Sequence, residues 1–179
     1  MEKEKKMKYS KIIKELDSNP PPMPQHSRNC IESLGGTDIK LVMHKIILES
    51  KPHNRLSMTI KKIKNKYLFS DHDEETNLIK DMEVRQVKLV DPCLKVTKVN
   101  LTSWLIGATQ AFSSNNQWHK FVAANADTDT LKTMAVFQIW SFNWVPRESQ
   151  KAELGFALIE VGDVPQLLSQ AMRVEGETN

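Results

Sequence analysis

A series of short segments with the period of β-strands constrains this chain more than any other feature. Between Arg55 and Ile60 apolar side chains alternate with polar ones, which is the pattern of a strand with one buried face. Further strands are predicted at Lys40–Leu48, Met82–Val90, Lys95–Leu105, around Phe112, and at Ala135–Trp144 and Glu153–Val161. Short helices are predicted within residues 61–77 and at Trp118–Ala124. This succession predicts an all-β domain with two short helices, built as a barrel or a sandwich.

The ends of the chain have a different character. Residues 1–37 are expected to be a basic N-terminal helix and a Pro/Gly-rich linker that is largely flexible, because the tract Asn19–Pro24 stops the helix. The folded domain is placed at residues 38–163. Residues 164–179 are expected to form a C-terminal tail with a frayed helix.

Composition narrows the functional classes. With 179 residues and 40% hydrophobic side chains, the chain can bury one good core. Cys30 and Cys93 lie far apart in the sequence and form no metal-ligand spacing, so neither a disulfide framework nor a structural zinc is predicted. No membrane span, no secretory leader and no nucleotide-binding or hydrolase motif is found. We therefore expect no enzyme, no cofactor, no small-molecule substrate and no membrane contact.

Charged side chains are distributed unevenly along the chain. Residues 40–66 hold eight basic and one acidic side chain, whereas residues 67–83 hold one basic and six acidic. The basic excess coincides with the first two predicted strands, which favours a cationic binding face over an unevenly charged solvated surface. The acidic run Asp71–Glu75 is interpreted as the solvated start of a helix, because consecutive carboxylates on a helix cannot converge on one metal ion.

Six pieces in a fixed order resemble the plant B3 DNA-binding domain, in particular its divergent reproductive-meristem-type and uncharacterised relatives. They are HNRLSMTI (His53–Ile60), KLVDPCLK (Lys88–Lys95), NLTSW (Asn100–Trp104), QWHKFV (Gln117–Val122), FQIWSF (Phe137–Phe142) and LGFALIEV (Leu154–Val161). The resemblance implies a seven-stranded open β pseudo-barrel that enters the DNA major groove with two arms. One arm maps to Glu49–Arg55 and the other to Thr102–Gln110.

The resemblance and the side-chain chemistry together give a set of expected DNA contacts. In the first arm, basic side chains can neutralise phosphates, and amide or hydroxyl groups can read a base edge. The second arm contains no Lys or Arg, and its Trp104 could equally belong to the core. The expected contacts are Lys45, Ser50, Lys51, His53, Asn54, Arg55, Lys98, Thr102, Trp104, Thr109 and Gln110.

The function that follows is sequence-specific binding of double-stranded DNA in the nucleus, as a transcription regulator with other transcription regulators as further partners. The neutral second arm leaves an alternative open, namely a degenerate barrel that acts as a protein–protein interaction module without specific DNA binding. Strand order, the DNA target and the oligomeric state do not follow from the sequence.

Overall fold

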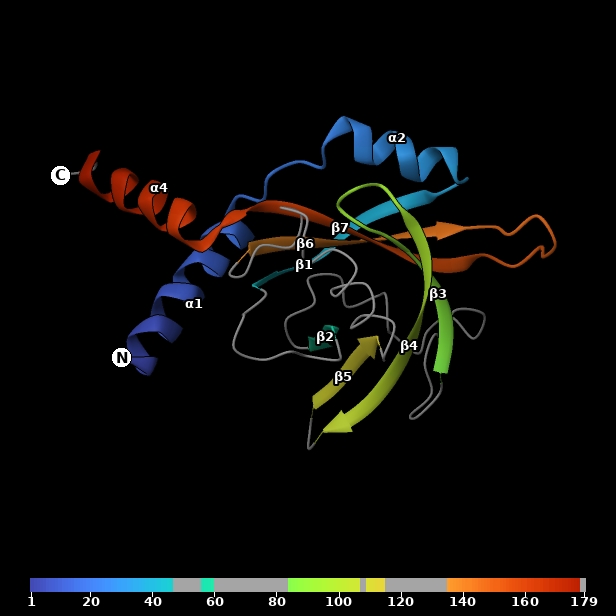
Figure 1. Cartoon of the computed structure of the whole chain (residues 1–179), viewed down its shortest axis with the longest axis horizontal. Helices are drawn as coiled ribbons and strands as arrows, with labels where there is room; N and C mark the ends of the chain where they lie inside the picture. The colour runs from blue at the N-terminus through green and yellow to red at the C-terminus, as the bar shows by residue number, and fades with distance from the viewer. Residues whose placement is uncertain (47–55, 60–83, 107–108, 115–134, 178–179) are drawn as a thin grey trace.

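Seven strands and three helices form the described part of the protein. The computed structural model describes residues 1–46, 56–59, 84–106, 109–114 and 135–177 (Figure 1). The strands are β1 (Thr37–Ile46), β2 (Leu56–Thr59), β3 (Val84–Val90), β4 (Val96–Ile106), β5 (Thr109–Ser114), β6 (Ala135–Trp144) and β7 (Glu153–Asp163). The helices are α1 (Glu2–Ser18), α2 (Gln25–Ser33) and α4 (Val164–Glu177). Each predicted strand is present, with bounds shifted by a few residues at most.

All seven strands belong to one open, mixed sheet in the order β1-β6-β7-β3-β4-β5-β2. Neighbours are antiparallel except for β3 and β7, which run parallel. The portion containing β4 and β5 bends away from the β1–β6–β7 portion (Figure 1). The seven-stranded all-β prediction is therefore confirmed at the level of the described sheet, while its curvature into a pseudo-barrel stays a prediction.

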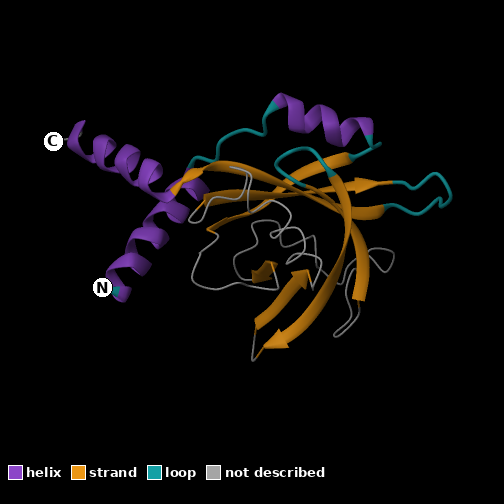
Figure 2. Cartoon of the chain, in the orientation of Figure 1, coloured by secondary structure: helices purple, strands orange, loops and turns teal. Residues whose placement is uncertain are grey.

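The centre of the sheet is buried on both faces. Along β6, eight of the ten residues are buried, which agrees with a strand that is apolar on both sides. On one face Phe142 and Trp144 of β6 pack with Val90 of β3 and with Ile31 of α2. Figure 2 shows α2 lying across this part of the sheet. A helix on the sheet face thus completes the core.

The presence of α2 corrects the prediction that this region is only a linker. Pro24 stands at the N-cap of α2, so the proline tract that ends α1 also introduces the next helix. Gly35, with φ of 78°, and the hydrogen bond from Gly36 N to Ile31 O at 2.9 Å end the helix in a Schellman motif. The two glycines therefore cap a helix, whose burial of Ile31 stabilises it beyond its short length.

A second apolar cluster joins both ends of the chain to the sheet. Ile12 and Leu16 of α1 pack with Val136 of β6 and Val164 at the start of α4. The expected helix at residues 1–17 is confirmed as α1, and the expected C-terminal helix as α4. The two helices predicted at 61–77 and 118–124 lie outside the described residues. The domain boundaries at 37/38 and 163/164 remain predictions.

Candidate nucleic-acid interface

The first predicted arm, Glu49–Arg55, lies outside the described residues, and with it Ser50, Lys51, His53, Asn54 and Arg55. The structure does describe the two ends from which this arm departs. Strand β1 stops at Ile46, at one edge of the sheet, and β2 begins at Leu56, at the other edge. The arm therefore has to connect the two outer strands of the sheet.

The second predicted arm coincides with the hairpin of β4 and β5. Thr102 and Trp104 lie in β4, where they pair with Ser113 and Ala111 of β5. Gln110 pairs with Leu105, and Thr109 pairs with Ile106 at the hairpin end. The four predicted contacts of this arm are therefore brought together on one ladder.

The register between β2 and β5 places the start of β2 relative to the β4–β5 hairpin. Leu56, which follows the first arm directly, pairs with Ser114, while the second arm ends at the opposite end of β5. Five residue steps separate Ser114 from Thr109, which corresponds to about 17 Å along an extended strand. Leu56 thus lies roughly five base-pair steps of B-DNA from the tip of the second arm, whereas Thr102, where that arm begins, pairs with Ser113, the neighbour of Ser114.

Lys45 and Lys98 do not lie together. Lys45 is half-buried in β1, and three strands separate β1 from β4, or about 19 Å across the sheet. Lys98 is exposed near the start of β4, eight residues before Ile106 and hence about 27 Å from the hairpin end. Lys98 lies four residues before Thr102, the first residue of the second arm, and its role in DNA contact stays a prediction.

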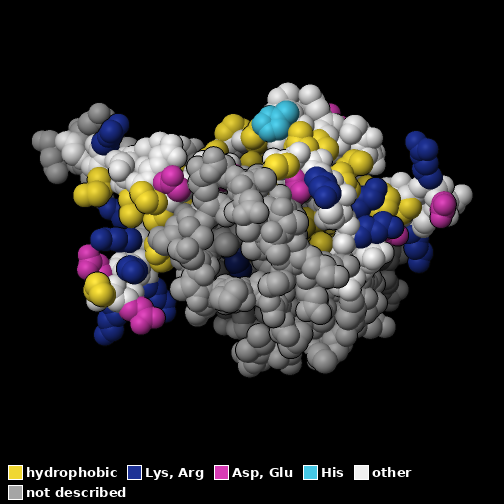
Figure 3. All heavy atoms as spheres, viewed as in Figure 1, with side chains coloured by type: hydrophobic (Ala, Val, Ile, Leu, Met, Phe, Trp, Pro, Cys, Tyr) yellow, Lys and Arg dark blue, Asp and Glu magenta, His cyan; other side chains and the backbone are white. Residues whose placement is uncertain are grey.

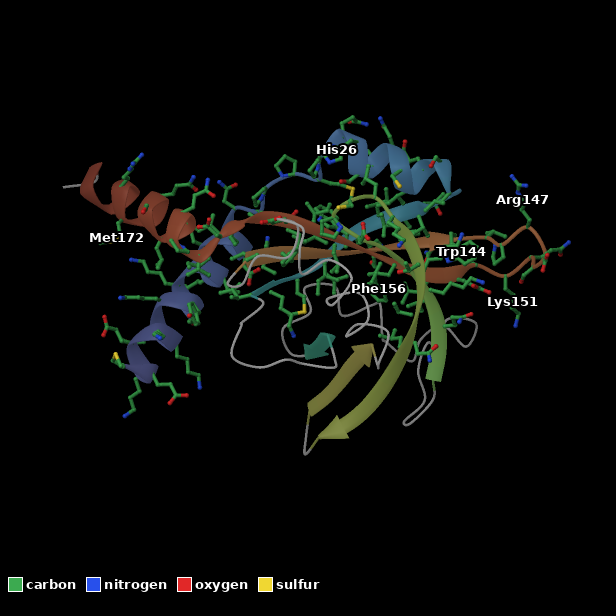
Figure 4. The ribbon with its side chains drawn as sticks, in the orientation of Figure 1. His26, Trp144, Arg147, Lys151, Phe156 and Met172 are labelled. Atoms are coloured by element: carbon green, nitrogen blue, oxygen red, sulfur yellow. The ribbon has the colours of Figure 1, made fainter. Side chains whose placement is uncertain are left out.

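Lys98 belongs instead to a cationic cluster that the sequence analysis did not identify. It stands directly opposite Lys88 on β3, and the Lys88 Nζ lies 3.5 Å from the centroid of the Trp144 ring. Like charges placed opposite each other destabilise a strand pair, whereas a cation over an indole face is stabilised. Figure 4 shows Trp144 at the inner end of the turn that carries Arg147 and Lys151. Strand pairing brings Lys88 and Trp144 together from distant parts of the sequence, so no local motif indicates them.

A polar network ties the N-terminal segment to the sheet. The buried Gln138 Nε2 donates to the Pro21 carbonyl oxygen at 2.8 Å and lies 3.3 Å from His44 Nε2. Gln138 Oε1 accepts a hydrogen bond from Trp140 Nε1 at 3.0 Å. These partners fix the orientation of the amide, because a carbonyl oxygen can only accept and an indole N–H can only donate.

The same network fixes the tautomer of His44. Its Nε2 faces the amide NH₂ of Gln138 and therefore accepts, so the ring proton stands on Nδ1. Nδ1 donates to Asp17 Oδ1 of α1 at 2.8 Å. Asp17 and His44 are 27 positions apart in the sequence, so no local spacing indicates this pair. The arrangement is structural, since it joins α1 and the proline tract to β1 and β6.

The described ranges contain neither a metal-binding cluster nor a membrane-spanning helix. No group of three or more His, Cys, Asp or Glu side chains that could hold a metal ion occurs in them. No helix in these ranges is long and apolar enough to span a bilayer.

One protein-family model matches most of this chain. Residues 20–161 match the family model described as "B3 domain-containing protein At2g31720-like". No curated protein matches the chain. Among solved structures, the chain is similar to the one titled "Arabidopsis FUS3-DNA complex", with 11% identity over 67% of this chain and 97% of that chain and a TM-score of 0.35.

Proposed function

This chain belongs to the B3 domain family, and from that premise we propose that it binds double-stranded DNA in the nucleus and regulates transcription. The loops Glu49–Arg55 and Thr102–Gln110 are the two arms in this proposal, presented by a sheet that curves into an open pseudo-barrel. No chemical step is involved. Binding rests on phosphate contacts, which position the protein, and on base contacts, which select the sequence.

The position of the β4–β5 hairpin relative to the start of β2 is the observation that carries the proposal. The β2–β5 register puts Leu56, the first described residue after the first arm, about 17 Å along the ladder from Thr109 at the tip of the second arm. A ladder of this kind holds the β4–β5 hairpin at a constant distance from the start of β2, so little order has to be gained in the second arm at the moment of binding. The strongly basic composition of residues 40–66 supplies the attraction for the phosphate backbone.

Charge reversal in the first arm tests the proposal. Lys51→Glu combined with Arg55→Glu should weaken binding to duplexes selected from a random pool. It should also lower the slope of log affinity against log salt by about two, one unit for each lost phosphate contact. The matched control is Arg147→Glu with Lys151→Glu, which changes the net charge equally at the exposed β6–β7 turn. Equal weakening by both double variants, or none by either, would contradict the proposal.

The composition of the second arm favours a second candidate function. Thr102–Gln110 contains neither Lys nor Arg, so it brings no cation to a phosphate. A degenerate barrel that binds another protein, including another transcription regulator, is consistent with this neutral hairpin. A stoichiometric protein partner, together with no shift of any duplex pool, would support this candidate over the first.

A further inference from the structure

Helix α1 is an addition to the family domain. The family model matches residues 20–161, whereas α1 spans Glu2–Ser18. It nevertheless packs against the sheet, because Ile12 and Leu16 are buried and Asp17 is bonded to the buried His44. Burial of Ile12 and Leu16, together with the hydrogen bond between Asp17 and His44, holds this helix in one place.

That place is beside the base of the first arm. Ile46, the last residue of β1, packs against the cluster formed by Ile12 and Leu16. The first arm begins at Glu49, three residues further along the chain. Figure 1 shows α1 leaving the sheet at this end of β1 and extending outward to the N-terminus. The helix therefore packs beside the end of β1 from which the chain continues toward the first arm.

The charge of α1 is predominantly basic. Its six lysines are exposed and outnumber its four carboxylates. Asp17 is bonded to His44, and Glu4 pairs with Lys8 at 3.0 Å. Within the described part of the chain, no salt bridge is found for Lys3, Lys5, Lys6 and Lys14. Figure 3 shows the dark blue side chains around α1 standing apart from the body of the molecule.

The length of the helix determines how far these lysines reach. Lys3 is thirteen residues from Leu16, or about 20 Å along the helix axis. Successive phosphates of one DNA strand are about 3.4 Å apart along the duplex axis, so 20 Å spans roughly six base pairs. Lys3, Lys5 and Lys6 therefore stand on the part of α1 that is farthest from its packing against the sheet.

We infer that α1 is an auxiliary nucleic-acid-binding helix, whose Lys3, Lys5 and Lys6 contact backbone phosphates on one flank of the segment held by the arms. The inference rests on the proposed DNA binding. It assigns no base contact to α1, because exposed lysines on a helix surface act as point charges toward phosphates. The helix raises affinity for any sequence and lengthens the footprint on one side.

The test compares three full-length proteins on the same random-sequence duplex pool. One is the unchanged protein, one carries Lys3→Glu, Lys5→Glu and Lys6→Glu, and the control carries Lys95→Glu, Arg147→Glu and Lys151→Glu. The control residues are exposed and belong to the turns at β3–β4 and β6–β7, with the same change in net charge. Binding is measured between about 50 and 200 mM salt, with hydroxyl-radical footprints on a bound duplex from the pool.

The α1 variant should lower the salt slope by up to about three and shorten the footprint on one flank by about six base pairs, while the control retains both. Unchanged slope and footprint in the α1 variant would overturn the inference and leave the proposed function intact. Equal losses in the two variants would also overturn it, because they would reflect net charge alone. Absence of salt-dependent duplex binding by the unchanged protein would overturn the proposed function, and this inference with it.

Discussion

The hydrogen-bond network around Gln138 gives a stability prediction that can be worked out from individual contacts. Gln138→Leu removes the amide and keeps a side chain of similar size, so the cavity left behind is small. Three polar groups then lose their partner, namely the Pro21 carbonyl oxygen, His44 Nε2 and Trp140 Nε1. The substitution tests whether these contacts hold the N-terminal segment on the sheet.

The expected loss is large compared with ordinary domain stability. An unsatisfied buried polar group costs about 1–3 kcal/mol, and the lower end applies to Pro21 and Trp140, which are half-buried. The three groups together give about 3–5 kcal/mol, against a total stability of roughly 5–15 kcal/mol for a typical domain. Equilibrium urea unfolding monitored by tryptophan fluorescence measures this difference.

Gln25→Leu is the matched control for this substitution. Gln25 Nε2 donates to Asn29 Oδ1 at 2.8 Å on the exposed surface of α2, where such a pair contributes at most about 0.5 kcal/mol. Limited proteolysis should also cut the Asn19–Pro24 tract sooner in the Gln138 variant than in the control. A stability loss in Gln138→Leu no larger than that of the control would refute the network as an anchor.

Two further substitutions test the packing and the charge pattern of the sheet. Gly155→Ala places a Cβ against the buried Phe142 ring and should cost about 1–3 kcal/mol in urea unfolding, whereas Gly176→Ala, with open space around it, should leave stability unchanged or slightly raised. Equal stability of both glycine variants would contradict this account of the close approach. Lys98→Glu replaces the like-charged pair with Lys88 by an ion pair and should add about 0.2–1 kcal/mol. If Lys98 also belongs to the DNA contacts, the same variant should weaken duplex binding, and unchanged affinity would remove it from that set.

The strands could be predicted from the sequence because their period is local. Ala135–Trp144 has the same bounds in the prediction and in β6, since a run that is apolar on both faces is typical of a central strand. Helix α2 was missed because its stability comes from Ile31 packing on the sheet, which is a contact between distant residues. The glycines at its end could have indicated a helix cap, but the same letters are equally typical of a linker.

The candidate site was less accessible to sequence reasoning than the fold. The hairpin Thr102–Gln110 was placed by family resemblance, and its β4–β5 ladder confirms the strand-to-strand connection there. Strand order puts β6, β7 and β3 between Lys45 and Lys98, so these two predicted DNA contacts lie on separate parts of the sheet, and their roles stay predictions. Strand order depends on which edges meet in the folded sheet, and a period along the chain does not contain that information.

The place of β7 has a consequence for how the protein is made. It lies between β6 and β3, so a nascent chain that has not yet reached Glu153 holds two separate pieces, β1 with β6 and β3 with β4, β5 and β2. Its parallel pairing with β3 also joins residues that are far apart in the chain, which slows folding through the entropy of closing a long loop. Synthesis on the ribosome must therefore have passed β7 before the sheet can assemble, and a chain stopped ahead of β7 would expose two unpaired strand edges to aggregation.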